Sequence, residues 1–305
     1  MASVTSPPLS SDQQKLRDGL GAGLAAYLLW GFLPLLFKLV ESVGSVGVVA
    51  ERTFWSLLFV GGILLVTRRM GEVRAALSDF KTVRAMAFSA LLLATNWLIY
   101  VWAVETDQVL EASFGYFVNP MVNVAIGMVV LGERHNRVQG IAILIALVAL
   151  VIQAIGLGRI PYIALSLALS FGFYGFVRKT APVAATAGLF VETLLLAPLA
   201  IGFLIWSFVS NGPGLHADPM IAFLLVLTGP ATAVPLLLFN YAVQRLRLTT
   251  IGMLQYIAPS IAFVLAIIVF GEHLNLTRVL SFALIWVSLA VFTLGSMQRR
   301  VPPPV

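Results

Sequence analysis

The chain is a succession of long apolar segments separated by short polar connections. Ten such segments can be drawn, near 19–37, 46–66, 83–103, 110–131, 138–157, 160–177, 184–209, 220–243, 249–270 and 277–296. Most are close to the roughly 20 residues that an apolar helix needs to cross a bilayer. Their hydrophobicity extends around the whole predicted helix, which suits lipid and packed neighbours better than water. The pattern predicts an all-α integral membrane protein with ten transmembrane helices.

The second half of the chain repeats the first. Displaced by 139 residues, Pro120, Gly132, Glu133, Asn136 and Ala103-Val104 return as Pro259, Gly271, Glu272, Asn275 and Ala242-Val243. Displaced by 141 residues, Gly31, Phe32, Lys38, Gly47 and Glu51 return as Gly172, Phe173, Lys179, Gly188 and Glu192. These offsets predict two five-helix repeats, 19–157 and 160–296, between tails 1–18 and 297–305. Because five is odd, the second copy is inverted in the membrane, as in many secondary transporters.

Composition and charge agree with this topology. The chain is 60% hydrophobic and 10% charged, with a mean hydropathy of +0.98, whereas a soluble domain carries about 25% charged residues. With the N-terminus inside, the inner connections hold fifteen cations: Lys15, Arg17, Arg68, Arg69, Arg74, Lys81, Arg84, Arg134, Arg137, Arg178, Lys179, Arg245, Arg247, Arg299 and Arg300. The outer ones hold only Lys38, Arg159 and Arg278. The positive-inside rule then predicts that both termini are cytoplasmic.

This distribution explains the net charge of +6 without a nucleic-acid partner. Residues 1–18 are polar and no convincing cleavage site follows them, so we expect an uncleaved first helix rather than a signal peptide. The longest inner connection, near 67–82, is too short to indicate a recognition domain for a partner protein.

Motifs for common enzyme chemistry are missing from the sequence. It contains no GxxxxGK[ST], no HExxH and no cysteine, and its three histidines, His135, His216 and His273, lie in separate predicted loops. These patterns would mark ATP, zinc or nucleophile sites. We therefore predict no metal, no cofactor and no catalytic site, and a protein that moves solutes would draw on an ion or solute gradient.

Charged residues inside apolar segments are the first candidate site residues. Glu51 and Arg52 lie in the second segment and Glu192 in the seventh, where a charge at mid-bilayer costs about 2.5–3.5 kcal/mol on insertion scales. They are candidates for proton coupling or substrate contact, or alternatively for ion pairs that only fix helix packing. Adjacent helical positions point about 100° apart, so Glu51 and Arg52 must find different partners.

Two prolines at repeat-related positions are the second signal. Pro120 and Pro259 lie inside the fourth and ninth segments, where each frees the carbonyl four residues earlier, at Tyr116 and Gln255. Matching helix interruptions indicate a central binding site, although a kink satisfied by a neighbouring helix explains them equally. The candidate binding residues are Asn96, Tyr100, Tyr116, Asn119, Asn123, Asn240, Tyr241, Gln255 and Tyr256. Intramembrane Asn can also join helices, and Tyr near a segment end can anchor it at the interface.

Tyr116, Asn119 and Asn123 follow helical spacing and form one polar stripe, which half two replaces with Gln255, Ala258 and Ala262. A cavity with one polar wall suits a small amphipathic solute better than a bare ion. The Gly-Glu pairs 132–133 and 271–272 end their segments, and we interpret them as structural helix ends.

Several of these stretches resemble one known family. NWLIYVWAV (96–104), LEASFGYFVNPMVN (110–123), GMVVLGER (127–134), SFGFYGFVRK (170–179) and RLRLTTIGMLQYIAPS (245–260) are similar to the RarD family. That family is in the EamA branch of the drug/metabolite transporter superfamily, and the resemblance covers residues 19–296. It implies a permease of the cytoplasmic (inner) membrane with ten helices in two inverted halves. It also implies a central cavity formed largely by the third, fourth, eighth and ninth helices. Relatives often carry His-Arg where this chain has Glu51-Arg52, which weakens a transferred proton-coupling role at position 51.

The leading hypothesis is a secondary transporter that exports small metabolites or chloramphenicol-like amphiphiles by alternating access. Its expected partners are a small-molecule substrate and the bilayer, with protons as coupling ion and a homodimer left open. A passive facilitator of the same fold is the nearest alternative; an integral membrane enzyme and a membrane scaffold are the others.

Overall fold

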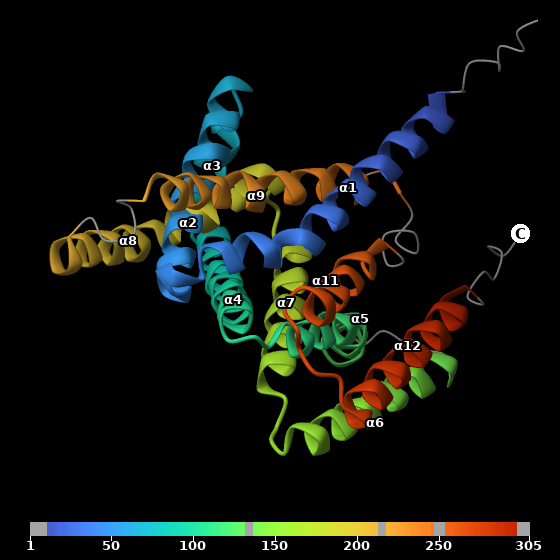
Figure 1. Ribbon diagram of the computed structural model, residues 1–305. Coiled ribbons are helices and arrows are strands. Elements are labelled where there is room, and N and C mark those ends of the chain that lie inside the picture. The colour runs from blue at the N-terminus through green and yellow to red at the C-terminus, as the bar shows by residue number, and fades with distance from the viewer. Residues whose placement is uncertain (1–10, 132–136, 213–217, 244, 247–253, 298–305) are drawn as a thin grey trace, which may run out of the picture.

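The computed structural model is all-helical over the residues that it describes, which are 11–131, 137–212, 218–243, 245–246 and 254–297 (Figure 1). The helices are α1 Ser11–Leu39, η1 Glu41–Val43, α2 Ser45–Val66, α3 Met70–Ser78, α4 Phe80–Glu105, α5 Val109–Leu131, α6 Arg137–Leu157, α7 Tyr162–Thr180, α8 Ala185–Asn211, α9 Pro219–Val243, α11 Ile257–Ile268 and α12 Leu276–Met297. Each of the ten apolar segments overlaps one of these α-helices, and α3 is additional. The helix α11 covers only part of the segment 249–270, of which residues 249–253 lie outside the described residues.

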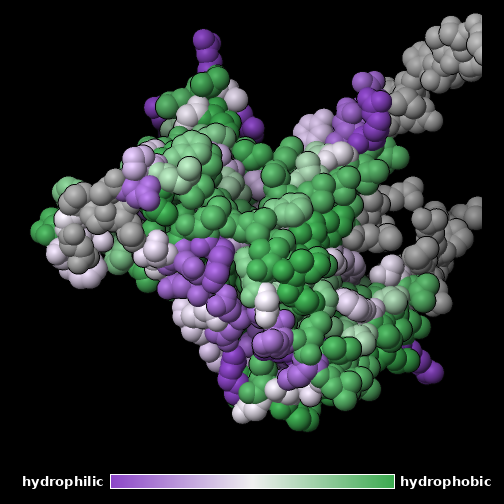
Figure 2. Space-filling model, viewed as in Figure 1, coloured by the Kyte–Doolittle hydropathy of each residue, from purple (hydrophilic) through white to green (hydrophobic). Residues whose placement is uncertain are grey.

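Seven helical stretches in the described part of the chain are long and apolar enough to cross a membrane. They are Gln14–Leu39, Ser45–Val66, Phe80–Glu105, Arg137–Leu157, Ala185–Ser210, Pro219–Phe239 and Leu276–Gly295. Apolar side chains cover most of the face in Figure 2, while hydrophilic residues gather in a band below its centre and at α3. Large apolar residues are exposed along α6 and α8, among them Leu144, Ile155 and Leu199. Exposed apolar surface of this extent is what lipid contact requires.

The short helix α3 lies in the connection near 67–82, which we predicted as an inner loop. Arg69 pairs with Glu72 in its first turn, with Nε 2.7 Å from Oε1. Asp79 then accepts hydrogen bonds from the backbone N–H groups of Lys81 and Thr82 and caps the start of α4. The Arg69–Glu72 pair therefore favours α3 locally, and the Asp79 N-cap favours the start of α4.

Contacts between helices come in matched pairs. If α1, α2, α4, α5 and α6 are equated with α7, α8, α9, α11 and α12, then α1–α9 matches α7–α4 and α1–α11 matches α7–α5. The contact α2–α9 matches α8–α4, and α2–α8, α5–α11 and α6–α12 each join a helix to its own equivalent. The pair α6–α12 lies side by side at the lower right of Figure 1. Exchanging the halves therefore leaves these main contacts unchanged.

Two glycines allow the closest approaches between the halves. A Cβ on Gly115 of α5 would lie 2.7 Å from the carbonyl oxygen of Ala164 in α7. A Cβ on Gly229 of α9 would lie 2.6 Å from the carbonyl carbon of Trp55 in α2. Small residues at such points let helix backbones pack directly in a membrane.

We expect Gly115→Ala to lower the free energy of unfolding by about 1–3 kcal/mol, because the backbone that it meets in α7 cannot rotate away. Gly140→Ala on α6 is the matched control, since its Cβ meets nothing within 4 Å. Denaturant-induced unfolding of the purified proteins in one detergent measures both. Equal stability of the two variants would contradict the close α5–α7 contact.

Candidate functional site

Asn96 in α4 is a hydrogen-bond junction between the halves. Its Nδ2 donates to the carbonyl of Leu167 at 3.2 Å and to Ser170 Oγ at 3.0 Å, both in α7. Its Oδ1 accepts from the hydroxyl of Tyr116 in α5 at 3.0 Å. Asn96 is buried, so these bonds satisfy an amide that would otherwise be costly in a lipid environment. The structure thus brings together two predicted site residues from neighbouring helices of half one.

Arg52 lies beside this junction in a cage of aromatic rings. Its guanidinium carbon is 4.2 Å from the ring centroid of Trp97 and 5.2 Å from that of Phe37. Its Nε donates to Thr232 Oγ1 in α9 at 2.5 Å, while its Nη1 is buried without a hydrogen-bond partner. Ring faces attract a cation, so Trp97, Phe37 and Thr232 hold the guanidinium where α2, α4, α1 and α9 meet.

A row of aromatic rings connects the two halves from this point. Phe37 packs edge-on against Tyr100 at 6.0 Å, and Tyr100 against Tyr116 at 5.6 Å between centroids. Tyr116 then packs against Phe171 at 6.1 Å, and Phe171 against Tyr174 at 5.8 Å. The first three pairs are edge-to-face, an arrangement that is favourable for aromatic rings, and the Phe171–Tyr174 pair is tilted at 34°.

At the far end of the aromatic row lies Glu192 of α8, which is fully buried. Ser89 Oγ of α4 donates to its Oε1 at 2.5 Å, and the Tyr174 hydroxyl donates to its Oε2 at 3.5 Å. Arg178 Nε lies 3.6 Å from Oε1. Glu192 is therefore paired and joins α4, α7 and α8, in keeping with the alternative that its charge fixes helix packing.

Glu51 and Arg52 find different partners, as their adjacent helical positions require. The Glu51 carboxylate is buried and its Oε2 accepts a hydrogen bond from Trp55 Nε1, one turn later in α2, at 2.8 Å. Arg52 faces the aromatic rings instead. The two neighbouring charges thus serve separate parts of the molecule.

Asn119, one turn after Tyr116 on α5, is fully buried, and neither Nδ2 nor Oδ1 has a hydrogen-bond partner. An unsatisfied buried amide costs about 1–3 kcal/mol. Pro120 follows it inside α5, where the ring removes one helix hydrogen bond. This unpartnered amide beside an interior proline is the strongest sign of a ligand contact among the predicted residues.

The remaining predicted residues do not join this group. Tyr241 is exposed near the end of α9 with the Arg245 guanidinium 3.4 Å from its ring centroid, which fits an interface anchor. Gln255 and Tyr256 are half-buried in the turn before α11. Pro259 lies in the first turn of α11, directly after the turn that contains Gln255 and Tyr256, and residues 249–253 of this segment lie outside the described residues. The side chains of Asn123 and Asn240 lie outside the described residues.

Several residues of the site were missed in the sequence. Arg178 was assigned to an inner loop, but α7 continues to Thr180 and carries it to Glu192. The unpaired Glu192 in an apolar segment, with a basic residue just across a short connection, could have indicated this pair. Phe37, Thr232 and Tyr174 have no sequence signal that separates them from other apolar-segment residues.

Carboxylates from other elements cap three helix starts at what we predicted as the outer side. Glu105 accepts from the backbone N–H and hydroxyl of Ser45 at the start of α2. Glu111 accepts from Ile163 N–H in the first turn of α7 and pairs with Arg159, whose Nη2 lies 2.8 Å from it. Glu272 accepts from the backbone N–H groups of Val109 and Leu110 at the start of α5. Helix N-termini favour such negative groups.

Glu272 also belongs to the second Gly-Glu pair, which we predicted to be a structural helix end. Gly271 has a φ of 68°, a left-handed conformation suited to glycine after a helix, and Glu272 ties this connection to α5. The pair 271–272 is structural in this sense. The pair 132–133 lies outside the described residues.

Burial raises the pKa of Glu272 to about 7, despite the opposing effect of the Val109 and Leu110 N–H groups. Arg278 lowers this pKa and Asp107 raises it. The folded protein therefore holds a proton that the unfolded chain releases near pH 4.5, and stability falls by up to about 1.4 kcal/mol per pH unit between about pH 4.5 and 7. Thermal unfolding at several pH values should show this slope in the wild type and lose it in Glu272→Gln. An unchanged slope in the variant would contradict it.

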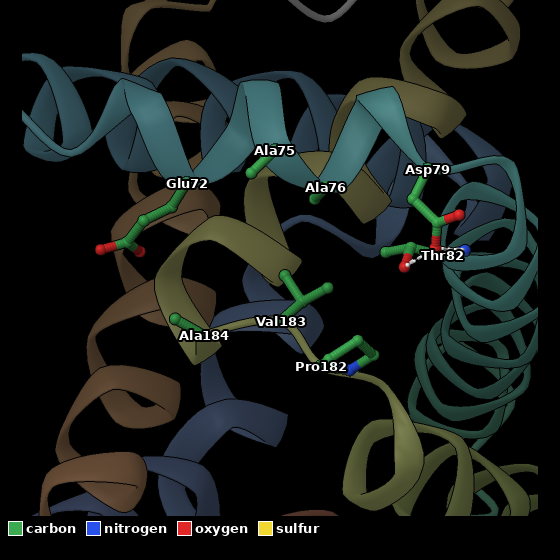
Figure 3. Close-up of a pocket in the computed structure, with 8 residues that line it drawn as sticks. All are labelled: Glu72, Ala75, Ala76, Asp79, Thr82, Pro182, Val183 and Ala184. Atoms are coloured by element: carbon green, nitrogen blue, oxygen red, sulfur yellow. Dashed lines mark hydrogen bonds between the residues drawn. The ribbon is translucent and has the colours of Figure 1, made fainter.

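A separate cavity of about 360 Å³ lies at α3 and the α7–α8 connection (Figure 3). Glu72, Asp79 and Thr82 line it with Pro182 and small apolar residues, and Thr82 bonds to Asp79 at its edge. None of the predicted site residues lines this cavity. In the described part of the chain no cluster of His, Asp and Glu is arranged to hold a metal ion.

Comparisons with known proteins identify the family of this chain. The sequence model of the EamA-like transporter family matches residues 18–154 and again 160–294. An uncharacterized transporter of Pseudomonas aeruginosa is 43% identical over 295 residues, which cover 95% of this chain and 98% of that protein. Protein RarD of Escherichia coli is 39% identical over 292 residues, covering 95% and 99% of the two chains.

Two further matches are more distant. Chloramphenicol-sensitive protein RarD of Pseudomonas aeruginosa is 29% identical, with 93% of this chain and 95% of that protein covered. A protein of known crystal structure shares the fold with a TM-score of 0.61 at 18% identity, covering 93% of this chain and 99% of its own. By these matches this multi-pass membrane protein belongs to the EamA-like transporter family, among the RarD proteins.

Proposed function

We propose that this protein is a secondary transporter that moves small amphipathic solutes across the inner membrane by alternating access. The site where the halves meet carries the proposal: the buried polar groups of Arg52, Asn96 and Asn119 lie near the half-buried Tyr116 in the row of aromatic rings. Such a mixture of apolar wall and few polar groups is typical of small-molecule sites. The buried residues lie between helices that would have to move for the site to open to either side.

The ten α-helices that overlap apolar segments would all cross the membrane, with both termini in the cytoplasm and the second half inverted. The matched helix contacts and the two separate family matches support this architecture. In transporters built from inverted repeats, one arrangement of the halves opens inward and the exchanged arrangement opens outward. The EamA relatives are transporters by name, which supports a transporter over an integral membrane enzyme.

Export is the proposed direction, and chloramphenicol is the first solute to test because one relative is named for sensitivity to it. A passive facilitator of the same fold is the second candidate. It differs in one respect, since it equilibrates solute without accumulating it. Glu51, buried and bonded to Trp55, is the proposed proton-coupling group. A homodimer would leave this site unchanged, since the site is built within one chain.

Inverted membrane vesicles from a host lacking its own exporters test the proposal. Uptake of labelled chloramphenicol and a panel of amino acids is followed with and without an imposed proton gradient, for wild type and Glu51→Gln. The matched control is Glu41→Gln, a carboxylate of η1 that pairs with Lys38 at the surface. We expect saturable, gradient-driven accumulation in wild type and control, and at least about a tenfold loss of the gradient effect in Glu51→Gln.

The outcomes separate the candidates. Equilibration without accumulation in all three proteins supports the facilitator. Accumulation that persists in Glu51→Gln rejects this residue as the coupling group while keeping the transporter. Flux absent for every solute rejects transport of this solute class.

A further inference from the structure

We propose that Arg52 is the counter-ion for a carboxylate group on the transported solute, so that the protein selects organic anions with an apolar body. This inference deepens the proposed function, and it rests on that function in assuming that the bound solute is transported. It begins from a charge in the apolar interior: Arg52 is 4% exposed and lies seven residues into α2, about 10 Å along the helix axis.

The hydrogen bonding of this guanidinium is incomplete. An arginine carries five N–H donors, yet among the described residues Arg52 donates only through Nε, to Thr232, and its buried Nη1 has no partner. Within the described part of the chain no carboxylate pairs with it. Ring faces of Trp97 and Phe37 stabilise the cation partly, but a π-face accepts no bidentate hydrogen bond.

The second intramembrane arginine gives the comparison. Arg178 lies beside the buried carboxylate of Glu192, which is how proteins ordinarily accommodate a buried charge. Arg52 is more deeply buried and lacks such a partner, although Glu51 is its neighbour in sequence and faces Trp55 instead. The arrangement leaves one buried positive charge for a group supplied from outside the chain.

The surroundings specify the rest of the ligand. Tyr100 and Tyr116 continue the rings away from Arg52 towards half two, and the unpartnered amide of Asn119 lies one turn along α5 from Tyr116. A carboxylate at Arg52 with a planar or aliphatic body along these rings uses both the charge and the apolar wall. Guanidinium and carboxylate match in bidentate geometry, and an inorganic anion would use the charge alone.

Matched pairs of ligands test this without needing flux. Acetate, butyrate, phenylacetate and indole-3-acetate are each compared with the primary amide of the same carbon skeleton, by ligand-dependent thermal stabilisation of the purified full-length protein. We expect the larger carboxylates to bind about 10- to 100-fold more tightly than their amides, the range for a charge-assisted hydrogen bond. No preference for the carboxylate in any of the four pairs overturns the proposal.

Variants assign the preference to Arg52. Arg52→Gln should reduce the carboxylate-to-amide ratio to about one, and Arg52→Lys should keep part of it. Arg69→Gln, at an exposed arginine that pairs with Glu72 on the surface, is the matched control and should keep the full ratio. If Arg52→Gln does not fold, the carboxylate-to-amide ratios of wild type and Arg52→Lys still test the assignment. A full ratio in a folded Arg52→Gln protein overturns the assignment.

Two further results separate the alternatives. Saturable stabilisation by chloride that blocks phenylacetate binding would assign Arg52 to an inorganic anion and overturn the solute part. Selective carboxylate binding in a protein whose vesicles show no flux would reject transport and support the anion site. Flux of amides and carboxylates at equal rates would reject the anion site and support transport.

Discussion

Replacing Arg178 with methionine is expected to lower the free energy of unfolding by about 3–5 kcal/mol, because it leaves a charge in the interior without its partner. Glu192 is fully buried, and Arg178 is the cation that the structure places beside it, 3.6 Å from Nε to Oε1. Ser89 and Tyr174 still donate to the carboxylate, but neutral donors do not replace a counter-charge.

A double-mutant cycle isolates the pair. Glu192→Leu alone leaves Arg178 without its carboxylate, while Arg178→Met combined with Glu192→Leu removes both charges. We expect the double variant to be more stable than Arg178→Met alone by at least about 2 kcal/mol. Denaturant unfolding in one detergent measures the four proteins. If the two single effects simply add, the pair does not interact and the assigned partner is wrong.

The pattern of apolar segments in the sequence predicted most of the helices of the fold. Each of the ten apolar segments overlaps a helix, because lipid-compatible helices are continuous and nearly free of charge. In the described part of the chain, seven helical stretches are long and apolar enough to cross a membrane. The boundaries were less certain where a helix carried a charge past its apolar stretch. Arg178 is the example: its side chain is paired inside the bundle, so α7 extends three residues beyond the segment drawn from hydrophobicity.

The candidate site was predicted by residue type rather than by contact. Asn96, Tyr100, Tyr116 and Arg52 were chosen because polar groups in apolar segments are costly, and the structure brings them together. Tyr241 was chosen by the same argument and lies exposed instead. Hydropathy does not report which side of a helix faces the partner half, and that orientation separates these two outcomes.

Repeat symmetry predicted helix pairing better than local geometry. Pro120 and Pro259 are equivalent in sequence, yet one lies inside α5 and the other in the first turn of α11. A proline in a first turn costs no hydrogen bond, whereas an interior one does. The helix starts therefore differ between the halves, and the site they form is asymmetric.

Replacing Asn119 with leucine is expected to raise the free energy of unfolding by about 1–3 kcal/mol, which is unusual for a buried substitution. Both polar atoms of this amide are buried and neither has a partner. Leucine has a similar shape and no group to leave unsatisfied. In the proposed transporter the same change should reduce solute flux at least about tenfold, because it removes the amide that binds the solute in the wild type.

Asn96→Leu is the matched control, since it exchanges the same residue types on the adjacent helix α4. Asn96 has partners in Tyr116, Leu167 and Ser170, so its removal should lower stability by about 1–3 kcal/mol. Unfolding of the purified proteins and vesicle uptake, each normalised to the amount of folded protein, give the two readouts.

The sign of the stability change decides the role of Asn119. Removal of a structural amide and removal of a ligand-binding amide both reduce flux. Only the removal of a structural amide also lowers the free energy of unfolding. If Asn119→Leu is less stable than wild type, the amide has a packing role, and the central site must be sought on other residues. If it is more stable and inactive, the protein retains an unsatisfied group in its core because the transported solute satisfies it.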